Sequence, residues 1–536
     1  MKLAKCFHPE HCLQRLQRFA EEGTPLVRGK EQRTATARRW GHDMAASASA
    51  NTDPRRSDAQ GARPFHEIPG PRGLPFLGTL FDYVNGKFTI KGFHHALISR
   101  YREYGPIWRE TIAGETIIHL MDPDYTKIVL QQEGKIPHIP PLLQTTQMYR
   151  QYRDLSPGLG NTNGEEWYRL RSAVQQMMMR PKAVSMFLPL VNEVADDFLK
   201  RISSIKNDQD EIPNFYNEVL KWNLESSGMT CFETRLGAIE ADADSEQQRM
   251  IDANQAIFHL SLKLKFAIPW FKVISTPTWK KLVEAEDNFF GKGQKLVDQT
   301  AAKIQALIDE GKFEEGQYGF LSYLLSKRDL TYKDVSIITL SLFGDGLSTT
   351  VPTLVGQLYC LASNPDAQEK LYDEISTVVP KNVPITTDMI GKMSYLKACV
   401  KEGFRFFPIG SEVSRIPQKD LVIGGYHIPA GTHLELNHNM LLRLPEYFED
   451  PDRYVPERWV RGESEQTTHP YLLIPFGHGP RMCAGRRFAE QEMYVVITKL
   501  LQEYKLEWRH EPMAQEYRML LFPDQSARFT FLKRSS

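Results

Sequence analysis

The chain has 536 residues, of which 41% are hydrophobic and 25% charged, an ordinary composition for a globular protein with a large core. Lysine plus arginine and aspartate plus glutamate number 66 each, so the balance excludes a strongly basic nucleic-acid-binding protein. Any electrostatic partner must therefore meet a local patch of charge.

The first 60 residues are predicted to lie outside the folded domain. They combine scattered arginines with a small-residue run from Ala45 to Ala50 and with polar residues up to Ala62. This segment is similar to a mitochondrial import presequence, although it holds more acidic residues than is usual, and the alternative is a disordered tail. No stretch reaches the roughly 18 consecutive apolar residues of a membrane-spanning helix, so we expect no N-terminal membrane anchor.

Folded structure is predicted to begin near Ile68, where Ile68-Pro69-Gly70-Pro71 opens a stiff run rich in proline and glycine. We assign residues 61–80 to a connector and residues 81–536 to one large domain, because no later linker or repeat is found. Hydrophobic periodicity predicts helices over 164–180, 187–205, 333–361, 366–377, 394–406 and 484–505, and β-branched runs predict strands over 115–120 and 421–423. The predicted fold class is mainly α with small β-sheets.

The segment from Phe266 to Lys272 is rich in aromatic residues, and Lys280 and Lys281 follow it. This composition suits a peripheral contact with a membrane surface. A buried loop between two helices explains it nearly as well.

Two features stand out in the predicted helix over 333–361. Asp345 lies four residues before Thr349, so the two side chains share a helical face. Pro352 has no N–H to donate to the carbonyl of Ser348, which predicts a kink at this point.

The predicted helix over 394–406 has two faces with different chemistry. Glu402 and Arg405 are three residues apart and are expected to form an ion pair. Lys397 and Lys401, four residues apart, form a basic stripe roughly a quarter turn away. Such a stripe can steer an acidic protein with little buried area.

Glycines surround one cysteine in Phe476-Gly477-His478-Gly479-Pro480-Arg481-Met482-Cys483-Ala484-Gly485-Arg486-Arg487. Glycine tolerates positive φ and lets the backbone approach a flat cofactor closely. The pattern then becomes helical, so Cys483 is expected at a helix N-terminus, where the dipole and free N–H groups lower the thiol pKa. The other five cysteines lack zinc-site or disulfide spacing and are expected to be inert.

Phe476, Gly479, Arg481, Cys483 and Gly485 match the signature F-x-x-G-x-R-x-C-x-G, so the chain resembles the cytochrome P450 family. The pair Glu402 and Arg405 matches its E-x-x-R motif, and Arg458 in Pro456-Glu457-Arg458-Trp459 matches the arginine that completes it. The resemblance implies a monooxygenase that uses O2 and haem b, with iron bound by Cys483. It also implies that residues 81–536 form the catalytic domain.

The resemblance assigns further residues to the cofactor. Trp167 and Arg171 match a W-x-x-x-R motif that binds a haem propionate, and Arg415 and Arg481 fill two other propionate positions. Phe476, Gly477 and Gly485 are expected beside the haem. Glu402, Arg405 and Arg458 are expected to support the haem loop rather than to take part in the chemistry.

The oxygen-activating helix departs from the family pattern A-G-x-D-T-T. Thr349 keeps the alcohol, but Ser348 replaces the acid and Asp345 replaces the small residue. We hypothesise that Ser348 and its freed carbonyl hold a relay water while Asp345 supplies the charge. The alternative is that Asp345 forms a salt bridge elsewhere and solvent alone relays protons.

Lys397 and Lys401, with Arg486 and Arg487 after the haem cysteine, are similar to the mitochondrial branch of the family, and most of all to its arthropod members. The resemblance implies an acidic ferredoxin with an NADPH-dependent reductase as electron donor, and a location on the matrix face of the inner mitochondrial membrane. An alternative is a haem-thiolate enzyme that needs no external electrons, such as a peroxide-driven enzyme, an isomerase or a dehydratase. A purely structural or binding role for the haem is a further alternative.

The substrate is expected to be lipophilic, such as a sterol or an ecdysteroid-like molecule. By resemblance, its pocket is lined by Phe407 to Ser414, the loop near Leu142 to Leu159, and Met519 to Pro523. Glu412 is expected to hold one polar group of the substrate.

Overall fold

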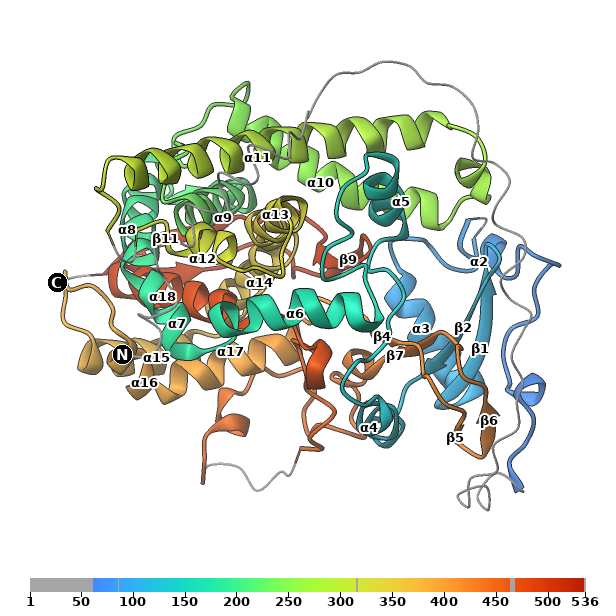
Figure 1. Ribbon diagram of the computed structural model, residues 1–536. Helices are drawn as coiled ribbons and strands as arrows, with labels where there is room; N and C mark the ends of the chain where they lie inside the picture. The colour runs from blue at the N-terminus through green and yellow to red at the C-terminus, as the bar shows by residue number, and fades with distance from the viewer. Residues whose placement is uncertain (1–60, 85, 315–316, 463–467, 535–536) are drawn as a thin grey trace.

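Helices make up most of this computed structural model, which describes residues 61–84, 86–314, 317–462 and 468–534. The predicted presequence, with Cys6 and Cys12, lies outside the described residues. Most helices gather on the left in Figure 1, and the largest sheet lies on the right. The predicted class, mainly α with small sheets, is confirmed.

The first half of the chain carries the helices that flank the site and the long helices that cover it. They are α2 (Leu80–Val84), α3 (Phe93–Tyr104), α4 (Pro123–Gln132), α5 (Gln144–Tyr152), α6 (Gly164–Met178), α7 (Pro181–Val184), α8 (Leu188–Ile205), α9 (Phe215–Phe232), α10 (Glu246–Lys265), the 3₁₀ turn η5 (Pro269–Lys272) and α11 (Pro277–Asp309).

The second half carries the helices around the predicted haem loop. They are α12 (Gly319–Leu325), α13 (Tyr332–Ser348), α14 (Thr350–Ala362), α15 (Pro365–Val378), α16 (Thr387–Lys392), α17 (Ser394–Phe406), the 3₁₀ turns η7 (Pro456–Trp459) and η8 (Gly479–Arg481), and α18 (Arg486–Glu503).

The strands form four small sheets in the described residues. The largest has the order β1-β2-β7-β4, in which β2 and β7 are parallel and the other neighbours antiparallel. Its strands are β1 (Ile107–Ile112), β2 (Glu115–Leu120), β7 (Leu434–Leu436) and β4 (Val413–Arg415). The remaining pairs join β5 (Leu421–Ile423) to β6 (Tyr426–Ile428), β9 (Gln515–Tyr517) to β10 (Leu521–Pro523), and β11 (Phe529–Lys533) to β3 (Glu211–Ile212) and β8 (Tyr504–Glu507).

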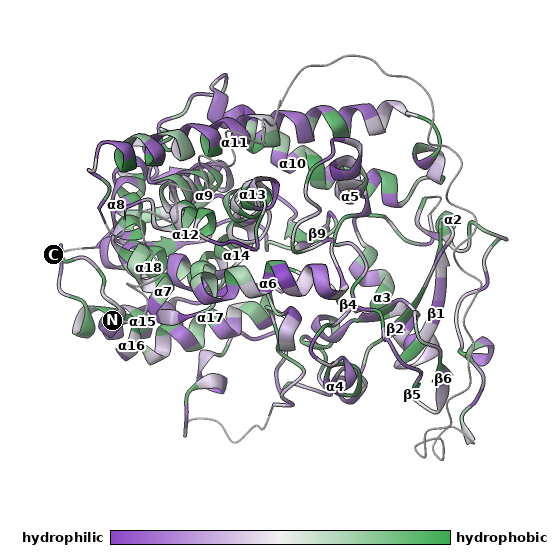
Figure 2. Cartoon of the chain, in the orientation of Figure 1, coloured by the Kyte–Doolittle hydropathy of each residue, from purple (hydrophilic) through white to green (hydrophobic). Residues whose placement is uncertain are grey.

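The main core forms where α9, α13 and α14 pass through the centre of the helical part. Every residue of α9 from Val219 to Phe232 is buried, as is every residue of α14. Figure 2 shows more hydrophilic colour on outer helices such as α11 than on these central ones. Most residues of α14 are apolar, as is usual for a helix buried on all sides, and its buried Gln357 donates to the Val400 carbonyl at 3.0 Å.

In three places the structure differs in detail from the elements predicted from the sequence, and all three bear on the site. The helix predicted over 333–361 is divided into α13 and α14 at Thr349, whose ψ of −57° goes with a φ of −125°. The predicted kink is therefore confirmed, because Pro352 lies in the first turn of α14, where a missing N–H costs nothing. The expected loop over 142–159 contains a helix, α5.

The connector is the third difference, because it packs on the domain earlier than Ile68. The N–H of Arg63 donates to the carbonyl of Gly425 at 2.8 Å, and the N–H of His427 donates to the carbonyl of Arg63 at 2.8 Å. The Arg63 guanidinium also lies 3.8 Å from the centre of the Tyr426 ring. Ordered packing thus begins at about the start of the described residues.

Candidate functional site

The loop before α18 places Cys483 at a helix N-terminus. The N–H of Cys483 donates to the carbonyl of Phe476 at 2.8 Å, which closes the loop. Gly477 and Gly479 have φ of 72° and 73°, a region that side chains disfavour. Gly485 has an ordinary φ of −79°, and a Cβ there would lie 3.8 Å from Cys483 Sγ. Two of the three glycines are therefore required by backbone conformation.

The Cys483 side chain is exposed by its accessible surface, yet protein atoms surround it on all sides. Both observations hold if Sγ faces an internal cavity rather than the outer surface of the protein. Burial raises the pKa of the Cys483 thiol, whereas the N–H groups of Gly485 and Arg486 and the Arg171 guanidinium lower it. The helix-terminal N–H groups therefore lower the thiol pKa as predicted, but the net direction is upward. Burial outweighs the helix terminus here.

The other described cysteines differ from Cys483. Cys231, Cys360 and Cys399 are buried, and burial raises the pKa of each thiol. Such thiols are poor nucleophiles and poor ligands.

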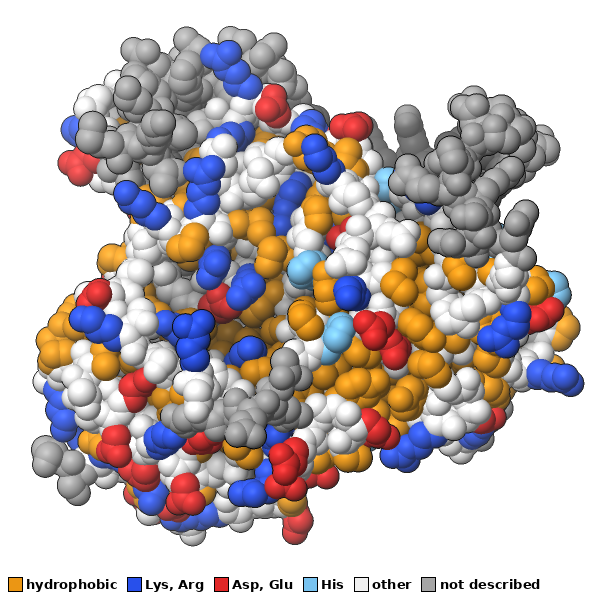
Figure 3. Space-filling view, turned by 90° about the horizontal axis from the view of Figure 1, so that it is seen from below, with side chains coloured by type: hydrophobic (Ala, Val, Ile, Leu, Met, Phe, Trp, Pro, Cys, Tyr) orange, Lys and Arg blue, Asp and Glu red, His pale blue; other side chains and the backbone are white. Residues whose placement is uncertain are grey.

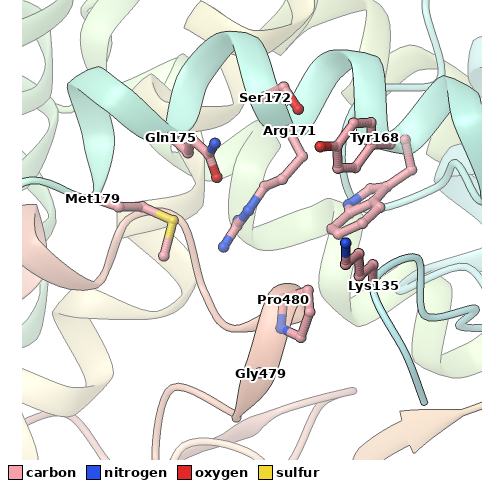
Figure 4. Close-up of a pocket in the computed structure, with 9 residues that line it drawn as sticks. Lys135, Tyr168, Arg171, Ser172, Gln175, Met179, Gly479 and Pro480 are labelled. Atoms are coloured by element: carbon pink, nitrogen blue, oxygen red, sulfur yellow. The ribbon is translucent and has the colours of Figure 1, made fainter.

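Three predicted propionate arginines converge above the loop, from α6, β4 and η8. Arg171 donates to the carbonyl of Met482 at 2.8 Å, and Arg481 stacks over the Trp167 ring at 4.1 Å. Arg415 pairs with Glu133 and donates to the carbonyl of His478 at 3.2 Å. Figure 4 shows Arg171 reaching from its helix toward the segment that carries Gly479 and Pro480.

The charges of this cluster fit a haem. Burial, and then the positive charges of Arg415 and Arg171, lower the pKa of Arg481 to about 9, and Glu133 opposes this. Three guanidiniums against the single carboxylate of Glu133 leave a surplus that two propionate groups would balance. A thiol facing an interior space and a surplus of two positive charges are together what a haem with iron requires.

The predicted ion pair on α17 is buried and joins this helix to residues 455–459. Arg405 binds Glu402 through two hydrogen bonds of 2.8 and 2.9 Å, and both side chains are fully buried. Glu402 also accepts from the Val455 N–H at 2.9 Å and from the Trp459 indole at 2.8 Å. Arg458 lies 3.5 Å from the same carboxylate. Phe404 on α17 packs edge-on against Phe476 at 5.2 Å, which links this network to the haem loop.

The structure changes the hypothesis for the distal helix. Thr349 Oγ1 donates to the backbone carbonyl of Asp345 at 2.7 Å, and Ser348 Oγ donates to the same carbonyl at 3.1 Å. Ser348 is buried. Both hydroxyls therefore contact the backbone of Asp345 rather than its carboxylate, as Ser and Thr side chains commonly do with a carbonyl one turn earlier.

The Asp345 carboxyl faces the interior. Its side chain has accessible surface although protein atoms surround it, as for Cys483. Burial raises its pKa to about 6, and the positive charge of Arg150 opposes this rise. No salt bridge of Asp345 is found among the described residues, so the structure does not contain the salt bridge of the alternative.

Two predicted lysines and an unpredicted arginine border one surface pocket. Lys397, Lys401 and Arg461 line a cavity of about 420 Å³ together with Trp459 and Val460. Lys401 lies 4.1 Å from the centre of the Trp459 ring. Seen from below, this face of the molecule has a hollow with Lys and Arg side chains at its edge, among hydrophobic and His side chains (Figure 3). Sequence reasoning missed Arg461 because no pattern places a residue 60 positions away beside Lys401.

The other two predicted basic residues are partly neutralised. Arg486 contacts Glu490 at 2.9 Å and Arg487 contacts the same carboxylate at 3.5 Å. Their contribution to a basic surface is smaller than the sequence indicated.

A second polar site lies on the wall predicted to line the substrate pocket. Burial and the charge of Glu435 raise the pKa of Glu412, and Lys265 opposes this rise. Lys265, at the end of α10, donates to the Tyr517 hydroxyl at 3.0 Å. The N–H of Leu521 donates to the carbonyl of Ile409 at 2.8 Å, so the hairpin of β9 and β10 packs on the same wall. Lys265 was not predicted, since tertiary packing alone brings α10 here.

The apolar segment after α10 is split between core and surface. Phe266 and Phe271 are buried, whereas Trp270 is 61% exposed and Val273 is 82% exposed. Tyr83 on α2 and Phe266 pack with ring centres 5.3 Å apart. The two segments joined by this contact carry the following exposed apolar side chains: Leu74, Phe76, Phe81, Val84, Ile268, Trp270, Val273 and Ile274. Within the described ranges, none of the helices combines the length and apolar character needed to cross a bilayer.

Comparison with known proteins gives consistent matches along the chain. The family model for cytochrome P450 matches residues 68–531. A Caenorhabditis elegans protein, probable cytochrome P450 CYP44, is 39% identical over 494 residues, 91% of this chain and 96% of that protein. Sterol 26-hydroxylase, mitochondrial, of Rattus norvegicus is 31% identical over 485 residues, 88% and 89% of the two chains. Probable cytochrome P450 301a1, mitochondrial, of Drosophila melanogaster is 30% identical over 499 residues, 90% and 89%.

Proposed function

Because this chain belongs to the cytochrome P450 family and is a haem monooxygenase, we propose that it takes electrons from a mitochondrial ferredoxin and oxidises a lipophilic substrate. Cys483 would bind the iron, and Arg171, Arg415 and Arg481 would bind the propionates. The bound haem supplies the iron that activates O2, and thiolate donation promotes O–O cleavage. The protein groups position the cofactor and set its surroundings.

The pocket of Lys397, Lys401 and Arg461 is the observation that carries the ferredoxin assignment. It lies on α17, which contacts the haem loop through Phe404. A concentrated basic surface close to the haem suits a small acidic iron–sulfur protein, because charge steers the encounter and little buried area is needed. An NADPH-dependent ferredoxin reductase would supply that protein with electrons.

A sterol or an ecdysteroid-like molecule is the proposed substrate. The hairpin that carries Leu521 and Phe522 supplies an apolar wall, and Glu412 supplies one polar contact in it. The rat relative, whose name is sterol 26-hydroxylase, supports this class.

We place the enzyme on the matrix face of the inner mitochondrial membrane. Two of the relatives carry the word mitochondrial in their names. The exposed corner formed by Trp270, Val273 and the residues near Phe76 would lie in the membrane surface, as amphipathic segments do.

Asp345 is the proposed internal acid that passes protons toward bound O2. With a pKa of about 6 it can gain and lose a proton near neutral pH. We expect Asp345→Asn to raise the hydrogen peroxide released per NADPH by roughly tenfold, because a missing relay favours release of partly reduced oxygen. Unchanged peroxide release would contradict the relay.

The experiment that tests the function is anaerobic reduction under carbon monoxide by a mitochondrial ferredoxin and its reductase, compared with reduction by dithionite. We expect both to give the red-shifted thiolate Soret band. If only dithionite gives this band, even with candidate sterols present, the assignment of Cys483 as iron ligand stands. The ferredoxin-dependent monooxygenase is then replaced by the alternative, a haem-thiolate enzyme that needs no external electrons. If neither gives it, Cys483 is not the iron ligand.

A further inference from the structure

Helices α5 and α11 share a row of ionisable side chains that runs inward from the surface. At its outer end, Arg153 pairs with Asp287, and these side chains are 40% and 39% exposed. The Tyr149 hydroxyl donates to Asp287 at 2.9 Å. Further along, Thr146 donates to Glu286 at 2.8 Å, and the Glu286 side chain is fully buried.

The inner end of the row has buried polar atoms without partners among the described residues. Oε2 of Glu286 accepts no hydrogen bond there and Nε of Arg150 donates none, although Arg150 donates through Nη1 to the carbonyl of Pro157 at 2.6 Å. Leaving such atoms unpaired in a protein interior is costly. They are the kind of atoms that hold a buried water molecule.

This inner end lies next to the distal helix. Phe289 is one turn after Glu286 on α11, and it packs so closely on Gly344 that a Cβ there would lie 2.5 Å from its ring. Gly344 directly precedes Asp345. The charges of Arg150 and Asp345 also act on each other, which places them in the same neighbourhood.

We propose that Glu286 is a proton-relay residue, passing protons from solvent at the Arg153–Asp287 end of the row to Asp345 through water held by Arg150. The proposal rests on the proposed function, because O2 activation is what consumes the protons. Each turnover takes two electrons from ferredoxin and two protons from solvent, puts one oxygen atom into the product and releases the other as water. Every proton that leaves Glu286 is replaced from solvent.

The acid strengths are suited to this transfer. Burial raises the pKa of Glu286 to about 7, with Thr146 and Arg150 opposing it, and the pKa of Asp345 is about 6. Two acids with pKa values close to each other and to neutral pH exchange a proton readily in both directions.

A first test needs no turnover. Infrared difference spectra of the holoenzyme over a pH titration should show a buried carboxyl that titrates near neutral pH and disappears in Glu286→Gln. In Asp345→Asn the same titration should shift to lower pH, because Arg150 then stabilises only the Glu286 carboxylate. An identical titration in Asp345→Asn would overturn the connection between the two acids.

The second test follows NADPH-driven O2 consumption with ferredoxin and reductase. Glu286→Gln should lower the rate at least tenfold and enlarge its solvent deuterium isotope effect, while the rate of reduction under carbon monoxide, which needs no protons, stays the same. If Glu286→Gln and the parent enzyme consume O2 at the same rate and with the same isotope effect, Glu286 has only a structural role. If ferredoxin does not reduce the parent enzyme, the proposed ferredoxin-dependent function is wrong.

Glu492→Gln is the matched control. Glu492 is buried on α18, accepts a hydrogen bond from Ser226 at 2.7 Å, and has a pKa raised by burial to about 7. Because the folded-state pKa of each glutamate lies above its ordinary value, the fold loses stability as pH rises from about 4.5 toward 7. Both variants should therefore flatten Tm against pH, but only Glu286→Gln should change the isotope effect. An equal change of the isotope effect in both variants would overturn the relay proposed for Glu286.

Discussion

Glu402 shows how one buried carboxylate can organise a cofactor site without touching the cofactor. It joins Arg405 on its own helix to Val455 and Trp459 in a segment more than fifty residues later. A buried charge is tolerated only when its hydrogen bonds are satisfied, and here they are. The geometry thus ties the segment of Val455 and Trp459 to the helix that packs on the haem loop.

We expect Glu402→Gln to destabilise the fold by about 3–5 kcal/mol, because it leaves the Arg405 guanidinium buried without a counter-charge. The measurements are the midpoint of thermal unfolding and the yield of haem-bound protein. Asp388→Asn is the control, since it removes an exposed pair with Lys392, with side chains 75% and 65% exposed. Equal stability of the two variants would mean that the buried network contributes little.

Among the helices, the break between α13 and α14 sets the geometry above the haem loop. Thr353 Oγ1 and its N–H both bond the Thr349 carbonyl, at 2.7 and 3.3 Å, so α14 starts well ordered. Gln255 on α10 donates to the Leu347 carbonyl at 3.2 Å, which satisfies a group near the end of α13. The break is therefore supported from both sides rather than being a flexible hinge.

Pro352→Ala should close the break, since the new N–H can donate to the Ser348 carbonyl. We expect slow hydrogen exchange at the new backbone amide and a stability change within about 1 kcal/mol, because the added hydrogen bond offsets the greater freedom of the unfolded chain. Rapid exchange at that amide would show that the packing of α10, and not the proline, keeps the helices apart.

Across the molecule, function depends on surfaces assembled from distant segments. Lys401→Gln should weaken ferredoxin binding roughly tenfold at low salt and reduce the salt dependence of reduction under carbon monoxide. Lys200→Gln is a suitable control because Lys200 is 77% exposed on α8, outside the basic pocket. Equal effects in the two variants would indicate a response to net charge only.

The exposed apolar corner makes a separate prediction. Trp270→Ser should weaken partitioning onto phospholipid vesicles roughly tenfold, since removing a large apolar side chain costs about 1.5–3 kcal/mol of burial. Val383→Ser changes another exposed apolar residue, between α15 and α16, and should have no effect. Loss of binding in both would argue against a defined membrane face. Flotation with vesicles provides the measurement.

Features that depend on local spacing could be predicted from the amino-acid sequence. Helical periodicity located α6, α8, α15, α17 and α18 within a few residues, and the motif residues identified the family. The kink at Pro352 was also predictable, because a missing N–H acts within one turn. The pairing of Glu402 with Arg405 follows from a spacing of three residues on one helix.

The meeting of distant residues became visible only in the folded chain. Arg461 beside Lys401, Lys265 near Glu412, and Arg150 with Glu286 beside the distal helix all join segments that no periodicity relates. The net pKa of Cys483 also escaped prediction, because burial depends on everything packed around the thiol while the helix terminus is local. The spacing of residues within one helix or strand determines which side chains share a face. Burial, and the interaction of charges from distant segments, arise only when helices and strands pack together.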